Sequence, residues 1–221
     1  MKTVLIAGCG YVGSALARRL LAAGYRVLGL KRRPAGLPEG VIPVCCDLAD
    51  REALRAVLPP AVDSVVLSLA ASSSGEEAYE AAYDVALGNL VDALGARSEP
   101  PARILFTSST SVHAQSSGEW VDESSPAEPT HYTGAIMRRA EARVLAAAGP
   151  SREAIVLRLG GIYGPGRTRL VEMVRRGEAT LTAAPLYTNR IHRDDCAGAI
   201  HHLLELERPA SLYLGTDAEP A

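Results

Sequence analysis

The sequence predicts an α/β protein built on one doubly wound parallel sheet. Two observations carry this prediction: apolar segments alternate with segments of helical periodicity, and the apolar segments are continuous rather than alternating with polar residues. Continuous apolar strands are typical of a parallel sheet covered by helices on both faces. The repeated strand-helix order then favours right-handed crossovers in a doubly wound arrangement.

The elements follow in a regular order. The first strand is expected over 3–8, and the helix over 12–24 ends at Gly24. Further strands are expected at 25–30, 41–46, 64–70, 102–109 and 154–160. Further helices are expected at 51–58, 76–96, 134–149 and 196–206, the last capped by Asp194 or Asp195. The polar segment 113–131, rich in Ser, Glu and Pro, is expected to form a long functional or mobile loop.

Composition narrows the class of protein. The chain has 221 residues with 48% hydrophobic and 22% charged residues and a net charge of −2, so neither nucleic acid nor an anionic membrane is expected as a partner. The four cysteines have no metal-ligand spacing, and we expect reduced thiols and no metal. The apolar run at the N-terminus is too short for a signal peptide or a membrane span. These features predict a cytoplasmic protein.

The stretch "AGCGYVG" lies between the first expected strand and the first expected helix. It places Gly8, Gly10 and Gly13 in G-x-G-x-x-G spacing. In a Rossmann-like βαβ unit, the first glycine turns the chain, the second lets the backbone approach a pyrophosphate, and the third lets the helix pack on the strand. The amide groups at the helix start, at Tyr11 and Val12, would hold the phosphates. A plain tight turn is the alternative.

The end of the second strand favours NADP over NAD. An acidic residue here would bind the ribose 2′-hydroxyl of NAD, but the sequence reads Lys31, Arg32 and Arg33. Guanidinium groups of Arg32 and Arg33 match a 2′-phosphate with charge-assisted hydrogen bonds. A basic loop exposed to solvent is the alternative.

Asp47 and Leu48 end the third expected strand. The Asp47 carboxylate is placed to accept from the adenine amino group, and Leu48 to pack against the base. Alternatively, Asp47 caps the helix that starts near Asp50.

A set of motifs is spread along nearly the whole chain: "AGCGYVG", "CCDL", "SLAAS", "LFTSSTSVH", "GEWVDESSPAEP", "LRLGGIYGPGR" and "NRIHRDDCAGAI". With these stretches the chain resembles the extended short-chain dehydrogenases/reductases of the NAD-dependent epimerase/dehydratase type, most closely their atypical branch. The resemblance implies that Leu69, Ala70 and Ala71 contact the adenosine ribose. It also implies that Ser109 is the catalytic hydroxyl that binds the substrate carbonyl or hydroxyl.

The chain departs from the family pattern at the catalytic Tyr-x-x-x-Lys pair. Aligned on Glu141, the tyrosine falls at Thr133 and the lysine at Met137. A shift by one residue brings Tyr132 into place as the catalytic tyrosine but leaves Ile136 at the lysine position. The lysine matters because its charge lowers the pKa of the tyrosine, and a free phenol, with a pKa of about 10, is a poor base at neutral pH.

The sequence therefore predicts a dinucleotide-binding domain over 1–160 and a small substrate lobe over 161–221, interleaved with the last part of the sheet. The expected function is an NADP(H)-dependent oxidoreductase or epimerase with a degenerate catalytic pair, acting on a small molecule. The alternative is a non-catalytic dinucleotide-binding protein that senses redox state or serves as a scaffold. A homodimer is left open.

Overall fold

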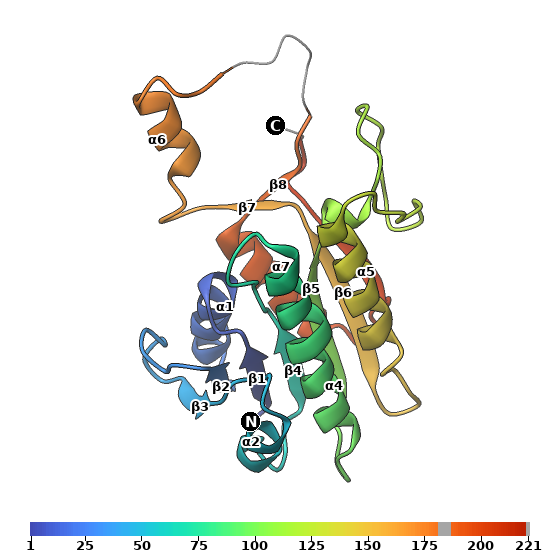
Figure 1. The fold of residues 1–221 in the computed structure, drawn as a ribbon. Coiled ribbons are helices and arrows are strands. Elements are labelled where there is room, and N and C mark those ends of the chain that lie inside the picture. Colours follow the sequence, from blue (N-terminus) through green and yellow to red (C-terminus); the bar gives the residue numbers. More distant parts are fainter. Residues whose placement is uncertain (181–186, 220–221) are drawn as a thin grey trace.

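The computed structural model describes residues 1–180 and 187–219 and confirms the doubly wound parallel sheet (Figure 1). Seven strands lie in the order β3-β2-β1-β4-β5-β6-β9, and every neighbouring pair is parallel. Their bounds are β1 (Thr3–Ala7), β2 (Arg26–Lys31), β3 (Ile42–Cys45), β4 (Ser64–Leu67), β5 (Arg103–Ser109), β6 (Glu153–Leu159) and β9 (Leu212–Gly215). The strand order reverses at β1 and β4, and the crevice at such a switch point is where open α/β sheets bind ligands.

Helices cover both faces of the sheet (Figure 1). On one face, α1 (Tyr11–Ala22) packs beside α7 (Arg193–Glu205). The other face is covered by α2 (Arg51–Val57), α4 (Leu87–Gly95) and α5 (Tyr132–Leu145). Each face has its own apolar cluster, so the strands are buried on both sides and carry the continuous apolar runs seen in the sequence.

The segment expected to be one helix over 76–96 has three parts. It begins as α3 (Glu76–Tyr79), continues as the π-helical segment η1 (Glu80–Ala86), and ends as α4. Apolar periodicity identifies helical character but does not reveal where the hydrogen-bond pattern widens, because a π-helical turn appears as a local insertion. The expected long helix is therefore confirmed over Glu76–Gly95, and the sequence analysis did not foresee its π-helical middle.

A smaller part of the structure stands apart from the sheet. Strands β7 (Gly161–Tyr163) and β8 (Arg190–His192) form a separate two-stranded parallel sheet. The helix α6 (Arg169–Arg175) buries none of its residues and projects from the body in Figure 1. Within the predicted lobe 161–221, α7 and β9 belong to the main body, since α7 packs on α1 and β9 pairs with β6.

Candidate dinucleotide-binding and active site

The glycine loop is built by close packing of the main chain. Gly8 has a φ of +84°, and a Cβ atom there would lie 2.2 Å from the carbonyl oxygen of Ser68. A Cβ atom on Gly13 would lie 2.7 Å from the carbonyl oxygen of Gly8. At Gly10 the nearest atom to such a Cβ is the same Gly8 oxygen, at 3.9 Å. The fold thus requires glycine at two positions, and at the third it leaves open space toward which a ligand can approach.

Helix α1 begins at this loop without a side-chain cap. Gly10 is its N-cap residue, and no side chain accepts a hydrogen bond from the first turn. Amide groups at Tyr11 and Val12 therefore lie where the helix dipole is positive. The Val12 side chain is buried, so this residue can serve a phosphate only through its main chain. This arrangement fits a bound pyrophosphate.

The basic residues follow β2 at the same edge of the sheet. Arg32 and Arg33 are exposed, whereas the Lys31 ammonium donates to the carbonyl oxygen of Ala35 at 3.0 Å. Lys31 thus stabilises the loop that follows β2. A contact of Arg32 and Arg33 with a ribose 2′-phosphate stays a prediction.

Asp47 and Leu48 follow β3, and the structure separates their roles. Asp50, not Asp47, caps α2, because its carboxylate accepts from the amides of Glu52 and Ala53. The capping alternative for Asp47 is therefore wrong; its carboxylate accepts from the Ala49 amide at 3.0 Å in a local turn. Asp47 is exposed, and Leu48 is largely packed into the core.

Residues Leu69, Ala70 and Ala71 follow β4 and lie next to the glycine loop. The Ser68 amide donates to the carbonyl oxygen of Ala7 at 2.8 Å, which joins the ends of β1 and β4. Ala70 is exposed, and Leu69 and Ala71 are half-buried. These three predicted contacts of the adenosine ribose are thus placed at the switch point of the sheet.

Ser109 ends β5 at the same edge. Its Oγ atom accepts from the Ser111 amide at 3.1 Å and caps the short 3₁₀ helix η2 (Thr110–Val112). The cap uses the oxygen as acceptor, so the hydroxyl hydrogen can still be donated to a substrate carbonyl. The half-buried side chain is held in one orientation by the cap.

Tyr132 is the first residue of α5, two positions before the expected helix start. Its hydroxyl donates to the main-chain carbonyl oxygen of Ser74. At the lysine positions of the family pattern, Ile136 is 1% exposed and Met137 is 3% exposed, and both belong to the core cluster on this face. The catalytic role expected for Tyr132 therefore has no neighbouring cation on this face of α5.

The two arginines of α5 contact other partners. Arg138 donates to Glu141 at 2.8 Å, and Arg139 donates to Asp84 at 2.5 Å. Neither guanidinium is placed beside the Tyr132 hydroxyl, whose partner is the Ser74 carbonyl.

A buried charge cluster lies beneath Ser109, and the sequence analysis missed it. Glu141 is 0% exposed and receives hydrogen bonds from Arg158 of β6, at 2.9 and 2.8 Å, and from Ser108 at 2.6 Å. Burial opposes the charge on Glu141, but the hydrogen bonds from Arg158, Ser108 and Arg138 outweigh it and lower its pKa. The signal was available: an arginine inside the apolar strand "AIVLRLG" requires a buried partner.

His113 connects this cluster to the long polar loop. Its Nδ1 atom lies 3.3 Å from the carbonyl oxygen of Pro126, and its Nε2 atom lies 3.3 Å from an Arg158 nitrogen. These partners fit a neutral ring that donates from Nδ1 and accepts at Nε2. Burial and the charge of Arg158 lower the pKa of His113. We therefore expect it to be neutral at pH 7.

Tyr11 joins the glycine loop to the segment that carries β7 and α6. Its hydroxyl donates to the carbonyl oxygen of Pro165 at 3.0 Å. The guanidinium of Arg167 lies 4.3 Å from the centre of its ring, and that of Arg193 lies 5.2 Å from it. The sequence showed the motif "GIYGPGR" but not that its arginine would stack on the glycine loop.

The cap of α7 differs from the expected one. Asp194 and Asp195 lie in the first turn, and the N-cap is His192, whose Nδ1 atom accepts from the Asp194 amide at 3.3 Å. The expectation of an aspartate cap was wrong because the helix begins three residues earlier than its apolar pattern suggested. His192 also contacts the ring of Tyr163, with 5.2 Å between the ring centres.

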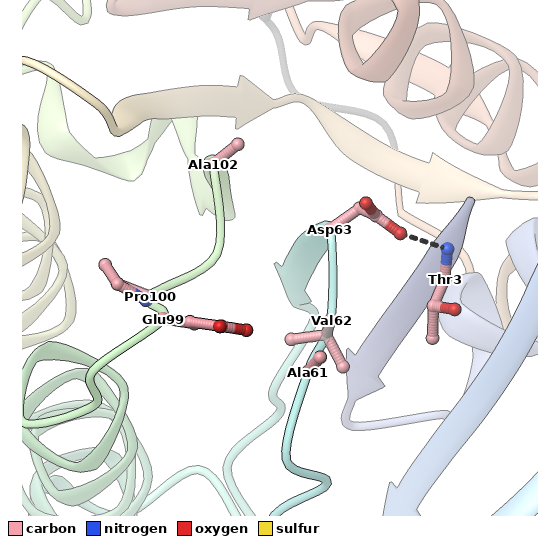
Figure 2. Close-up of a pocket in the computed structure, with 7 residues that line it drawn as sticks. All are labelled: Thr3, Ala61, Val62, Asp63, Glu99, Pro100 and Ala102. Carbon is pink, nitrogen blue, oxygen red and sulfur yellow. Dashed lines mark hydrogen bonds between the residues drawn. The ribbon is translucent and has the colours of Figure 1, made fainter.

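Two hollows lie at opposite edges of the sheet. One has a volume of about 260 Å³, and Figure 2 shows the residues that line it, among them Thr3 and Asp63. The Thr3 amide donates to the Asp63 carboxylate at 2.6 Å. The lining residues Thr3, Asp63 and Ala102 lie at or just before the starts of β1, β4 and β5, so this hollow is at the wrong edge for a dinucleotide. An open hollow of about 750 Å³ lies beside the loop after β4; it is lined by Ser73, Gly75, Glu76, Glu77, Ala78 and Ala81.

Among residues 1–180 and 187–219, no cluster of three or more His, Cys, Asp or Glu side chains could hold a metal ion. Over the same ranges, no helix has the length and apolar character needed to cross a bilayer.

Comparison with known proteins identifies the class. Residues 4–212 match the model of the NAD dependent epimerase/dehydratase family, and the chain belongs to this family. The fold, the strand order and the glycine loop agree with that assignment. Membership supports an NAD(P)-dependent protein of the oxidoreductase or epimerase type.

Individual relatives place the chain within the family. It is 33% identical to Protein YeeZ of Escherichia coli K12 over 236 residues, covering 100% of this chain and 80% of that protein. It is 34% identical to the 2-alkyl-3-oxoalkanoate reductase of Stenotrophomonas maltophilia, covering 82% of this chain and 58% of the reductase. A solved structure described as an NAD-dependent epimerase/dehydratase from Methylobacillus flagellatus is 36% identical, with a TM-score of 0.83, covering 99% of this chain and 77% of that one.

Proposed function

We propose that this protein is an NADP(H)-binding oxidoreductase or epimerase that acts on a small molecule. The observation that carries the proposal is the glycine loop, which excludes side chains at Gly8 and Gly13 and leaves open space at Gly10. The uncapped start of α1 adds amide donors and a positive dipole at the same place. A pyrophosphate fits this set of donors.

Each part of the dinucleotide has residues suited to it. Arg32, with help from Arg33, would bind the 2′-phosphate and thereby prefer NADP over NAD, because no carboxylate at the end of β2 is offered to a free 2′-hydroxyl. Asp47 would accept from the adenine amino group. Leu48 would pack against the adenine base, and Leu69, Ala70 and Ala71 would line the adenosine ribose.

The chemistry at the other end of the dinucleotide would depend on Ser109. When bound, the nicotinamide ring would supply a hydride donor or acceptor. Ser109, held by its cap on η2, would donate a hydrogen bond to the substrate carbonyl and orient it. The first turns of α5 offer no lysine, so we expect turnover of ordinary sugar-nucleotide and carbonyl substrates to be absent or very slow.

A non-catalytic dinucleotide-binding protein is the second candidate, and a specific observation favours it. The hydroxyl of Tyr132 is already bonded to Ser74, and Met137 fills the place where the family pattern has its lysine. A redox-sensing or scaffold protein needs the dinucleotide site but not the catalytic pair.

Two measurements on the same protein separate these candidates. Calorimetric titrations with NADPH and NADH, side by side at fixed salt, should show tighter binding of NADPH. A panel of carbonyl substrates is then tested for NADPH oxidation. NADPH oxidation faster than the rate without protein, even if very slow, supports the enzyme, and tight binding with no oxidation above that rate supports the second candidate. If neither dinucleotide binds, both candidates fail.

A further inference from the structure

Two tyrosine hydroxyls hold the segment that follows β4. This segment, residues 68–75, is called the β4 loop below. Tyr83 of η1 donates to the carbonyl oxygen of Leu69 at 3.3 Å, and Tyr132 of α5 donates to the carbonyl oxygen of Ser74. The two acceptors lie near the two ends of the β4 loop, so the loop is attached to the helical layer at both ends.

The ring of Tyr79 links the two donors. It packs edge-to-face against Tyr132, with 5.9 Å between ring centres and an angle of 87°, and lies 5.5 Å from Tyr83. Tyr83 also contacts Phe106 of β5, at 6.3 Å. Tyr79, Tyr83 and Tyr132 are called the tyrosine bracket below. Aromatic contacts of this geometry favour defined ring orientations, so the two hydroxyls are held in place before any ligand binds.

The bracket lies across the start of the π-helical segment η1. Tyr79 precedes η1 and Tyr83 lies within it, four residues later, so the two rings lie on the same side of the helix. The same segment is tied to α5 by Arg139, whose guanidinium pairs with Asp84 at 2.5 Å and with Glu80 at 3.8 Å. Such π-helical insertions occur frequently at functional sites.

Both hydroxyls of the tyrosine bracket act as hydrogen-bond donors, so both must be protonated. Burial, together with the neighbouring Tyr79, raises the pKa of Tyr83 to about 12, so this residue remains a hydrogen-bond donor at neutral pH. Tyr132 has one hydroxyl hydrogen, and the Ser74 carbonyl oxygen can only accept. While that bond exists, Tyr132 has no hydrogen to give to a substrate.

We propose that the tyrosine bracket positions the β4 loop for dinucleotide binding, and that Tyr132 is a positioning residue rather than a proton-transfer residue. The inference rests on the proposed function, because the β4 loop carries the predicted ribose contacts. The loop also begins against the glycine loop, where a Cβ atom on Gly8 would lie 2.2 Å from the Ser68 carbonyl oxygen. A displaced β4 loop would therefore change the wall beside the bound pyrophosphate.

The test removes each hydroxyl and keeps each ring. Tyr132→Phe and Tyr83→Phe are compared with the unmodified protein by amide hydrogen exchange of peptides covering 68–75, without ligand. Affinities for NADPH and for its adenosine-side fragment 2′-phospho-ADP-ribose are then measured by calorimetry. Each variant should exchange faster in the β4 loop and bind both ligands about 2- to 10-fold more weakly, as expected for the loss of one hydrogen bond.

A control variant matches this design. Tyr25→Phe removes a tyrosine hydroxyl that bonds Glu205 at 3.1 Å on the other face of the sheet, and it should change neither loop exchange nor affinity.

The outcomes are distinct. If Tyr132→Phe leaves loop exchange and both affinities unchanged, the inference is wrong. If that variant instead loses turnover without any change in exchange or affinity, Tyr132 acts in the chemistry, and the positioning role is overturned. If the unmodified protein binds neither NADPH nor NADH, the proposed function fails. In that case, unchanged exchange in the variants would also overturn the role of the tyrosine bracket. Faster exchange in the variants would show that the tyrosine bracket holds the β4 loop.

Discussion

The glycine loop and the first turns of α5 lie at the same edge of the sheet, but the glycine loop depends on its main chain and α5 depends on its side chains. In the glycine loop the main chain itself forms the proposed phosphate site, and its packing against Ser68 and Gly8 excludes side chains at two positions. In α5, catalysis in the family pattern depends on the side chains of a tyrosine and a lysine. The side chains present at these positions contact other parts of the protein. Tyr132 bonds Ser74, and Met137 packs in the core.

The difference shows how binding and chemistry can separate within one fold. A site built from the main chain persists as long as the strands and helix that shape it persist, because the same glycines serve both packing and binding. A site built from side chains is lost when one or two of them change, and the helix remains stable. Glu141, eight residues beyond Thr133, illustrates this stability, since it anchors α5 to β6 through Arg158.

The largest effect is expected from breaking that anchor. Glu141→Gln keeps the shape of the side chain and leaves Arg158, which is 3% exposed, without its counter-charge. Removing one partner of a buried ion pair should lower the free energy of unfolding by about 3–5 kcal/mol. Denaturant unfolding measures this loss of stability, and Asp92→Asn is the control. Asp92 is 44% exposed, and its ion pairs with Arg51 and Arg143 should contribute at most about 1 kcal/mol. A loss as small as that of the control would show that the buried cluster is not the anchor of α5.

The next effect tests the glycine loop directly. Gly10→Val should keep the fold, because a Cβ atom there meets only the Gly8 oxygen at 3.9 Å. It should weaken dinucleotide binding at least about 100-fold, equal to about 2.8 kcal/mol, by blocking approach to the main chain. Gly13→Val is the contrast: its Cβ would lie 2.7 Å from the Gly8 oxygen, so it should lower stability as well. Unchanged affinity in Gly10→Val would remove the main support for the dinucleotide site.

The third effect concerns cofactor choice. Arg32→Ala should weaken NADPH binding about 10- to 150-fold, since a hydrogen bond to a charged group contributes about 1.5–3 kcal/mol. NADH binding should barely change. Calorimetry at fixed salt compares this variant with Arg175→Ala, which removes an exposed arginine of α6 far along the chain from the loop. Equal losses for NADPH and NADH would mean that Arg32 acts only through general charge.

The smallest effect is a dependence of stability on pH. The folded protein lowers the pKa of His113, so the unfolded chain takes up a proton first as the pH falls. The stabilising contribution is complete above the ordinary histidine pKa of about 6.5 and is lost as the pH falls toward the folded pKa. His113→Gln should make the thermal midpoint depend less on pH between about 7.5 and 5.5. An identical pH dependence in both proteins would contradict the assignment of a neutral His113.

Long apolar strands and the glycine spacing could be predicted because they depend on local patterns. The strands β1, β3, β4 and β5 lie within the expected segments, and β2 and β6 extend one residue beyond theirs, since burial on both faces produces continuous apolar runs. The three-residue strands β7 and β8 have too little sequence to show a period. The cap at His192 was missed because a histidine is an unusual cap, whereas two aspartates follow it.

The sequence by itself determined the doubly wound sheet, the glycine loop and the absence of a Tyr-x-x-x-Lys pair, because each is a matter of residue type at short spacing. Only the tertiary structure decided what replaced that pair. The bond from Tyr132 to Ser74 joins residues 58 positions apart, and the pair of Glu141 with Arg158 joins α5 to β6. Such contacts depend on how strands and helices meet in space, and buried polar groups take their partners from whichever elements the packing brings together.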